Sequence, residues 1–213
     1  MIELIIFDLD GTLVDSCEDI TQALNYCLEK SGISGFSKEE VKKMVGEGVN
    51  RLIEKALDAK KICLPVQELI ECFVKYYKEH IADFSKVYPE VHETLTQLKN
   101  IKKAVISNKL TELTVKTLES LALLQYFDFV AGSDLFPERK PSPKPIIETI
   151  KKFNTTTDKT LIVGDSELDI IAGKQAGVRT VAVTYGYRER EILKEADFII
   201  DKFSDLLKIV REL

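Results

Sequence analysis

Two aspartates near the start of the chain, Asp8 and Asp10, have the spacing of residues that act together. They follow the apolar run Leu4–Phe7, which predicts a buried strand, and they precede Gly11-Thr12. Side chains two residues apart on an extended backbone point to the same side, so the two carboxylates would face each other. They repel unless a cation neutralises them or one of them holds a proton. A solvated acidic turn is the alternative, but it would not need an apolar strand behind it.

A second acidic pair follows another apolar run. Leu161–Val163 predicts a strand, Asp165 stands at its end, and Asp169 lies one helical turn further along the chain. Two acidic pairs side by side would repel each other strongly unless a divalent cation lay between them. Because these oxygen donors have no His or Cys among them, they indicate a hard ion, Mg²⁺ above all.

Polar and basic residues follow two further runs. Ser107 and Asn108 come directly after Ala104–Ile106, where a hydroxyl, an amide and backbone N–H groups can donate hydrogen bonds to an anionic oxygen. Lys140 lies in a proline-rich loop whose stiffness would hold its charge at a fixed place for carboxylates or phosphate. The alternatives are a helix cap for the first pair and a turn with solvated lysines for the loop.

Six short apolar runs, separated by helix-like segments, indicate the elements that must position these residues. The alternation predicts βαβ crossovers and an α/β fold, a doubly wound parallel sheet with a Rossmann-like core. In such sheets the ligand site lies outside the carboxyl ends of the strands. The runs are Leu4–Phe7, Ala104–Ile106, Phe127–Ala131, Leu161–Val163, Thr180–Val183 and Phe198–Ile200.

One stretch, from about Ser16 to Val87, breaks the alternation. It carries helical patterns over 19–30, 38–45, 49–60 and 66–79 with no strand between them. We expect an all-helical insertion over residues 16–87, with residues 1–15 and 88–213 forming the α/β core. The connections at the two ends of the insertion would be its hinges.

Composition excludes several classes of function. The chain has 213 residues, 45% of them hydrophobic, which suits one domain that carries an insertion. A net charge of −5 argues against nucleic acid as a partner. No apolar run reaches about 18 residues and no basic leader precedes the first strand, so we expect neither a membrane span nor a signal peptide. Four cysteines without CxxC spacing fit reduced thiols in a cytoplasmic protein, which we expect to be a monomer or homodimer.

The order of the polar residues resembles the four motifs of the haloacid dehalogenase superfamily. The resemblance covers the whole chain, and each motif follows its own predicted strand. It implies an α/β core with a helical cap inserted after the first motif, where the four helical patterns lie. The motifs are Asp8-x-Asp10-Gly11-Thr12, Ser107, Lys140-Pro141 and Gly164-Asp165-x-x-x-Asp169.

The resemblance also implies how the acids act. Asp8 would attack phosphorus and form an aspartyl-phosphate, and Asp10 would protonate the leaving alkoxide and then deprotonate water. Mg²⁺ would be bound by Asp8, by Asp165 and by the main-chain oxygen of Asp10. Dehalogenases of the superfamily lack the second acid, because halide leaves without a proton. An acid at position 10 therefore favours phosphomonoester hydrolysis.

The remaining motif residues would serve the phosphoryl group. Ser107, Asn108 and Lys140 would bind its oxygens, whose charge must be stabilised in the transition state. Asp169 would lie behind the metal ligands and orient metal-bound water or Lys140.

Within the superfamily the chain is similar to the phosphoglycolate phosphatases, notably around the first acids and in Ser107-Asn108-Lys109. This implies a small phosphorylated metabolite as substrate, with Gly46, Glu47 and Gly48 and the helix start after them contributing specificity. Glu90 departs from the pattern, since these relatives usually have glycine at this position. The alternatives are a pyrophosphatase, a sugar-phosphate or nucleotide phosphatase, a β-phosphoglucomutase-like phosphotransferase and a non-catalytic phosphate-binding regulatory protein.

Overall fold

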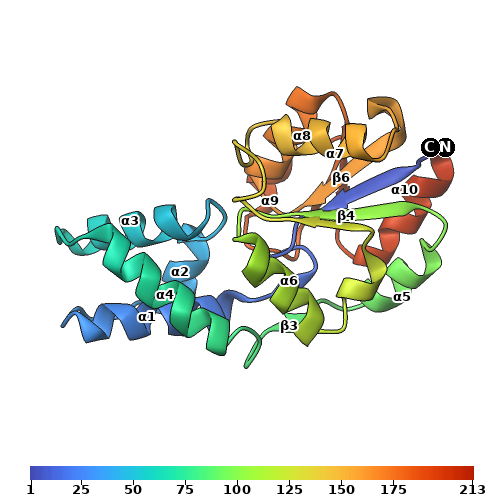
Figure 1. The fold of residues 1–213 in the computed structure, drawn as a ribbon. Coiled ribbons are helices and arrows are strands. Elements are labelled where there is room, and N and C mark those ends of the chain that lie inside the picture. The colour runs from blue at the N-terminus through green and yellow to red at the C-terminus, as the bar shows by residue number, and fades with distance from the viewer.

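The structure, a computed structural model, describes all residues, 1–213, as two units that lie side by side (Figure 1). The larger unit is a six-stranded sheet with helices on both faces, and the smaller consists of four helices. None of the helices combines the length and the apolar character that crossing a membrane would require.

Six parallel strands form the sheet of the larger unit. Their bounds are β1 Leu4–Phe7, β4 Lys102–Ile106, β5 Phe129–Ala131, β6 Thr160–Gly164, β7 Arg179–Val183 and β8 Phe198–Ile200. The strand order is β5-β4-β1-β6-β7-β8, so β1 lies between β4 and β6. All carboxyl ends therefore share one edge of the sheet, and the predicted doubly wound parallel fold is confirmed.

Helices cover both faces of this sheet. Their bounds are α5 Val91–Gln97, α6 Thr111–Ser120, α7 Lys144–Lys152, α8 Glu167–Ala176, α9 Arg190–Leu193 and α10 Leu206–Glu212. Leu4 and Ile6 of β1 pack with α7 and α8, whereas Ile5 and Phe7 face the core beneath α5 and α10 (Figure 1). This alternation is the period of an extended strand. Each fully buried side chain contributes about 1.5–3 kcal/mol, so β1 holds the residues that follow it firmly.

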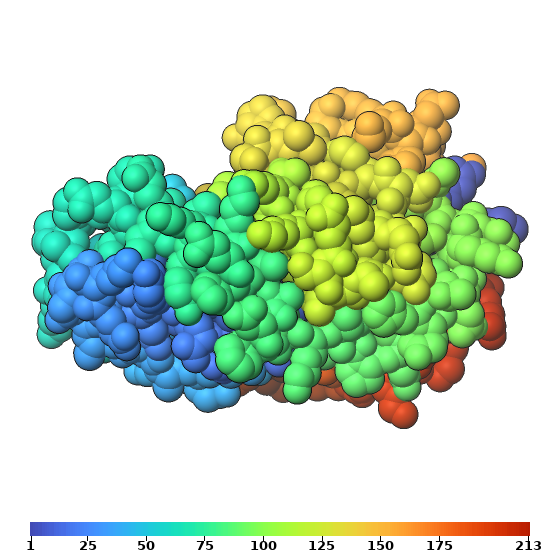
Figure 2. Space-filling model, turned by 60° about the horizontal axis from the view of Figure 1, so that its bottom comes forward, coloured from blue at the N-terminus to red at the C-terminus, as the bar shows by residue number.

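The smaller unit has a hydrophobic core of its own. Its helices are α1 Cys17–Lys30, α2 Lys38–Met44, α3 Val49–Lys60 and α4 Val66–Glu79. A capping box between Ser37 and Glu40 begins α2. The core cluster of this unit also includes Leu113 and Tyr187 of the larger unit. The two units are therefore packed against each other, and on the face shown in Figure 2 the atoms of α4 lie against those of α6.

A short antiparallel ribbon connects the two units. It pairs β2 (Val14–Asp15) with β3 (Lys86–Val87), so the two crossings of the chain lie next to each other. Glu90 follows the ribbon with φ of +67°, in the left-handed region that favours glycine. A glycine would adopt this conformation without strain. The division into a core and a cap over residues 16–87 stays a prediction.

Candidate active site

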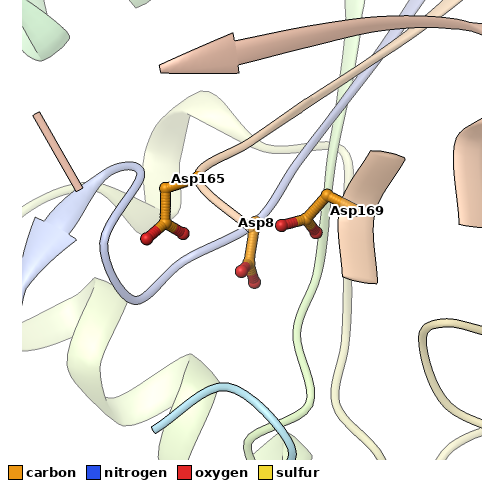
Figure 3. A group of neighbouring side chains, drawn as sticks. All are labelled: Asp8, Asp165 and Asp169. Carbon is orange, nitrogen blue, oxygen red and sulfur yellow. The ribbon is translucent and has the colours of Figure 1, made fainter. Parts of the chain in front are cut away.

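Three carboxylates meet beyond the carboxyl ends of β1 and β6 (Figure 3). Asp8 follows β1, Asp165 follows β6, and Asp169 lies in the first turn of α8. One oxygen of each lies within 4.8 Å of the others. Asp165 and Asp169 are each 2% exposed, so the cluster is shielded from bulk water. The sheet thus brings together acids that are far apart in the sequence.

The cluster carries more negative than positive charge. Lys140 is the cation within it, with its ammonium 2.9 Å from Asp8 Oδ1 and 2.7 Å from Asp169 Oδ1. Burial, opposed by Lys140 and reinforced by Asp169, raises the pKa of Asp8 from 3.8 to about 7. Burial and then the charges of Asp8 and Asp169 raise the pKa of Asp165 to about 8. Three carboxyl groups thus share one positive charge.

Asp169 has protein donors on both of its oxygens. Its Oδ1 accepts from Lys140, and its Oδ2 accepts from the hydroxyl of Ser166 at 2.6 Å. Ser166 and Asp169 also form the capping box that begins α8. Asp169 is thus placed to hold Lys140 next to Asp8.

Other oxygens of the site are free to bind a cation. Asp8 Oδ1 accepts from Lys140 and from the main-chain N–H of Leu9, whereas Asp8 Oδ2 accepts from no group of the protein. The main-chain oxygen of Asp10 also accepts no hydrogen bond. Together with Asp165 these oxygens form a set that suits a hard divalent ion.

Gly11 makes room for this set. Its φ is +86°, and a Cβ there would come within 2.2 Å of the Asp165 carboxylate. A larger residue would both strain the turn and displace the acid. The glycine of the first motif is therefore explained by the close approach of the β1 turn to Asp165.

Ser107 and Asn108 follow β4 beside the acids. The Ser107 hydroxyl accepts from the Lys109 N–H at 3.2 Å and donates to no protein acceptor, so its hydrogen is free for an anion. The Asn108 side chain is engaged, because Nδ2 donates to the carbonyl oxygens of Gly46 and Lys140, each at 2.9 Å. Its Oδ1 is buried without a partner. Only the main-chain N–H of Asn108 is left to donate to a ligand.

Asp10 is held by residues outside the predicted set of site residues. Its Oδ1 accepts from the hydroxyl of Ser16 and from the ammonium of Lys109, the latter at 2.7 Å. Lys109 also donates to the hydroxyl of Tyr77, at the end of α4, at 2.8 Å. Burial opposes the charge of Lys109, but Asp10 and Tyr77 outweigh it and raise the lysine pKa, so Lys109 is charged. Asp10 Oδ2 has no protein partner.

The loop between α2 and α3 closes the site from the other side. Gly46 and Gly48 line a cavity of about 60 Å³ that also borders Asp8, Asp10 and Ser107. The larger unit holds this loop at two successive carbonyls, since Asn108 donates to Gly46 and Arg188 donates to Val45 at 2.7 Å.

Glu47, expected together with its two glycine neighbours, does not line the cavity. Its carboxylate pairs with Lys55 at 2.5 Å and with Arg51 at 3.7 Å. These two cations of α3 hold the side chain away from the cavity, so the loop adds no negative charge to it.

The fold and this arrangement of acids define a family of hydrolases. Residues 5–183 match the haloacid dehalogenase-like hydrolase family, and the chain belongs to it. The predicted superfamily is confirmed.

Several named proteins are similar to the chain over nearly its whole length. The chain is 42% identical over 209 residues to the phosphoglycolate phosphatase of Aquifex aeolicus, covering 97% of this chain and 96% of that protein. It is 38% identical over 216 residues to the phosphoglycolate phosphatase of Photorhabdus laumondii, covering 98% and 92%. The crystal structure of a predicted phosphoglycolate phosphatase from Haemophilus somnus matches with a TM-score of 0.91 at 34% identity, covering 98% and 97%. The predicted enzyme class, a phosphatase, is confirmed.

Proposed function

We propose that the chain is a Mg²⁺-dependent phosphatase that hydrolyses 2-phosphoglycolate through an aspartyl-phosphate. One observation carries the proposal: the two acids of the first motif border a small, partly enclosed cavity of about 60 Å³. Pockets for drug-sized ligands have volumes of about 300–1,000 Å³, so this cavity favours a compact substrate over a sugar phosphate. The name shared by the relatives supports the same substrate.

Asp8, Asp165 and the main-chain oxygen of Asp10 would hold the Mg²⁺. Asp8 Oδ2 and the Asp10 carbonyl oxygen have no protein donor, and Asp165 Oδ1 has only the Thr12 hydroxyl at 3.3 Å. The raised pKa values of Asp8 and Asp165 also support this set. When bound, the ion supplies positive charge between a carboxylate and a phosphate dianion that would otherwise repel each other.

Asp8 and Asp10 would carry out different steps, each through the carboxylate oxygen that has no protein partner. Asp8 Oδ2 attacks phosphorus, and the bond from phosphorus to the glycolate oxygen breaks. Asp10 Oδ2 gives its proton to that oxygen and later takes a proton from the water that hydrolyses the aspartyl-phosphate. Inorganic phosphate then leaves, and both carboxyl groups return to their initial states. Ser16 and Lys109 hold Asp10 in place through its other oxygen.

Three donors would bind the phosphoryl oxygens. They are the Ser107 hydroxyl, the Lys140 ammonium and, in place of the predicted side chain, the main-chain N–H of Asn108. Donors fixed in place before the reaction stabilise the charge that develops in the transition state. Asp169 would keep Lys140 in position.

Residues 16–87 would act as a cap that excludes water from the cavity while chemistry proceeds. The hydrogen bonds that hold the Val45 and Gly46 carbonyls support a closed state. The cytoplasmic location, the absence of nucleic-acid and membrane partners, and the monomeric or homodimeric state stay predictions.

The test is a comparison of kcat/KM for phosphoglycolate, pyrophosphate, a hexose phosphate and a nucleoside monophosphate at one Mg²⁺ concentration. We expect phosphoglycolate to exceed each of the others at least about tenfold, or about 1.4 kcal/mol of transition-state preference. A hexose phosphate that exceeds phosphoglycolate by this factor would overturn the substrate. Full turnover in excess chelator would overturn the metal dependence.

A further inference from the structure

One lysine of the cavity has a hydrogen-bond donor that the proposed chemistry does not use. Lys109 extends from the loop after β4, and its side chain is 6% exposed. An ammonium has three N–H donors. Two of them donate to Asp10 Oδ1 and to the hydroxyl of Tyr77. The third has no acceptor in the protein, although Lys109 borders the cavity.

Tyr77 offers a second unused donor at the same place. The residue is 1% exposed and lines the cavity from α4. Its hydroxyl oxygen accepts from Lys109, but its hydroxyl hydrogen has no protein acceptor. Buried tyrosine hydroxyls ordinarily donate to a partner. Since Lys109 belongs to the larger unit and Tyr77 to the helical one, the two donors meet only when these units are closed on each other.

The rest of the cavity wall carries no positive charge. Eight of its fifteen lining residues are hydrophobic, and the charged ones besides Lys109 are Asp8 and Asp10. Arg51, near the start of α3, pairs with Glu47 and Glu54 and does not line the cavity. An anionic group on the substrate therefore has one cation to contact there, Lys109.

The place of Lys109 also determines how far that anionic group can lie from phosphorus. Asp10, whose carboxylate must reach the bridging oxygen, lies 2.7 Å from the Lys109 ammonium. In phosphoglycolate one methylene separates the bridging oxygen from the carboxylate. A carboxylate that close to Asp10 lies within reach of both unused donors, whereas a longer substrate would need more room than about 60 Å³.

We propose that the Lys109 ammonium and the Tyr77 hydroxyl form the subsite that binds the carboxylate of a compact phosphomonoester. This inference rests on the proposed function and adds the residues that select a carboxylated substrate over an uncharged one. Lys109 has two contacts at once, since it positions Asp10 through one N–H and binds the carboxylate through another.

The test measures binding without turnover, because Lys109 also contacts Asp10. Two phosphonates serve as probes: 3-phosphonopropionate, which has the shape of phosphoglycolate with a methylene for the bridging oxygen, and propylphosphonate, which lacks the carboxylate. Titration calorimetry with Mg²⁺ gives the ratio of their dissociation constants. We expect the wild-type protein to favour the carboxylated probe at least about tenfold, as hydrogen bonds to charged groups warrant.

Four variants locate the source of this preference. Lys109→Met should bring the ratio close to one, and Tyr77→Phe, which removes only a hydroxyl, should reduce it about threefold or more. Lys109→Arg should keep part of the preference, because the charge remains. Lys60→Met, a lysine of α3 that contacts Ser34 and Gly35 outside the cavity wall, should leave it unchanged. An unchanged affinity for propylphosphonate shows in each case that the phosphonate site is intact.

The outcomes separate this subsite from the proposed function. Equal binding of both probes by the wild-type protein would contradict phosphoglycolate as the substrate. A wild-type preference that Lys109→Met and Tyr77→Phe both retain would overturn the subsite alone and favour the backbone N–H groups at the start of α3. If Lys109→Met does not fold, the ratio in Tyr77→Phe decides.

Discussion

We expect the metal-free protein to lose stability as the pH rises from 5 to 8. Asp8 and Asp165 have pKa values of about 7 and about 8, above the ordinary 3.8 of an aspartate. An acid whose pKa is raised by folding binds its proton more tightly in the folded state. The folded state therefore gains from low pH, and this contribution is lost as the pH rises through the folded pKa.

The size of the effect follows from the shift of Asp8. One pH unit of difference between folded and unfolded pKa corresponds to about 1.4 kcal/mol, so the shift of Asp8 corresponds to about 4 kcal/mol in total. Between pH 5 and pH 7, where the unfolded carboxyl has already titrated, about 2 kcal/mol of this is lost. Asp165 adds to the loss up to pH 8.

Urea unfolding at pH 5, 6, 7 and 8, in chelator and in Mg²⁺, measures this dependence. Mg²⁺ should stabilise the protein more at pH 8 than at pH 5, because protons compete with the ion for the same carboxylates. Asp165→Asn should reduce the pH dependence in chelator, whereas Asp58→Asn, on the exposed face of α3, should leave it unchanged. A free energy of unfolding in chelator that rises from pH 5 to pH 8 would refute the reasoning. Equal stabilisation by Mg²⁺ at pH 5 and at pH 8 would refute it too.

Three further predictions concern single residues. Asp8→Asn should keep its circular dichroism spectrum and lose turnover, since an amide is no nucleophile; wild-type activity would rule out a covalent intermediate. Asp10→Asn should lose far more activity on phosphoglycolate than on 4-nitrophenyl phosphate, whose leaving group needs no proton, and equal losses would contradict the acid. Arg188→Met removes the donor to the Val45 carbonyl and should speed proteolysis at the ribbon that joins the units; cleavage at the wild-type rate would show that this contact does not hold the loop.

The sheet and the acid cluster could be predicted because their signals are local. The predicted strand at Phe198–Ile200 and the predicted helices at Val49–Lys60 and Val66–Glu79 have the observed bounds, since buried runs and apolar periodicity mark them. Asp8 and Asp165 lie together because parallel strands bring their carboxyl ends to one edge.

The contacts between the two units could not be predicted in this way. Tyr77 has the pattern of a core aromatic on α4, and nothing near it in the sequence indicates that its hydroxyl meets Lys109. The structure places Asn108 at the predicted site, but its side chain donates to the Gly46 carbonyl. These contacts depend on how the helical unit sits on the sheet, which is a property of the packed interface and not of any short segment.

The ribbon of β2 and β3 affects how the inserted helical segment can be replaced in evolution. Asp15 and Lys86 are paired neighbours, so the chain leaves the sheet and returns to it at one place. Deleting the helices between them would leave two ends that a two-residue hairpin turn can join. Another insert can therefore replace the helical segment at this place. Such a replacement would give the cavity a different wall, whereas the order of the six strands and the reacting acids would stay the same.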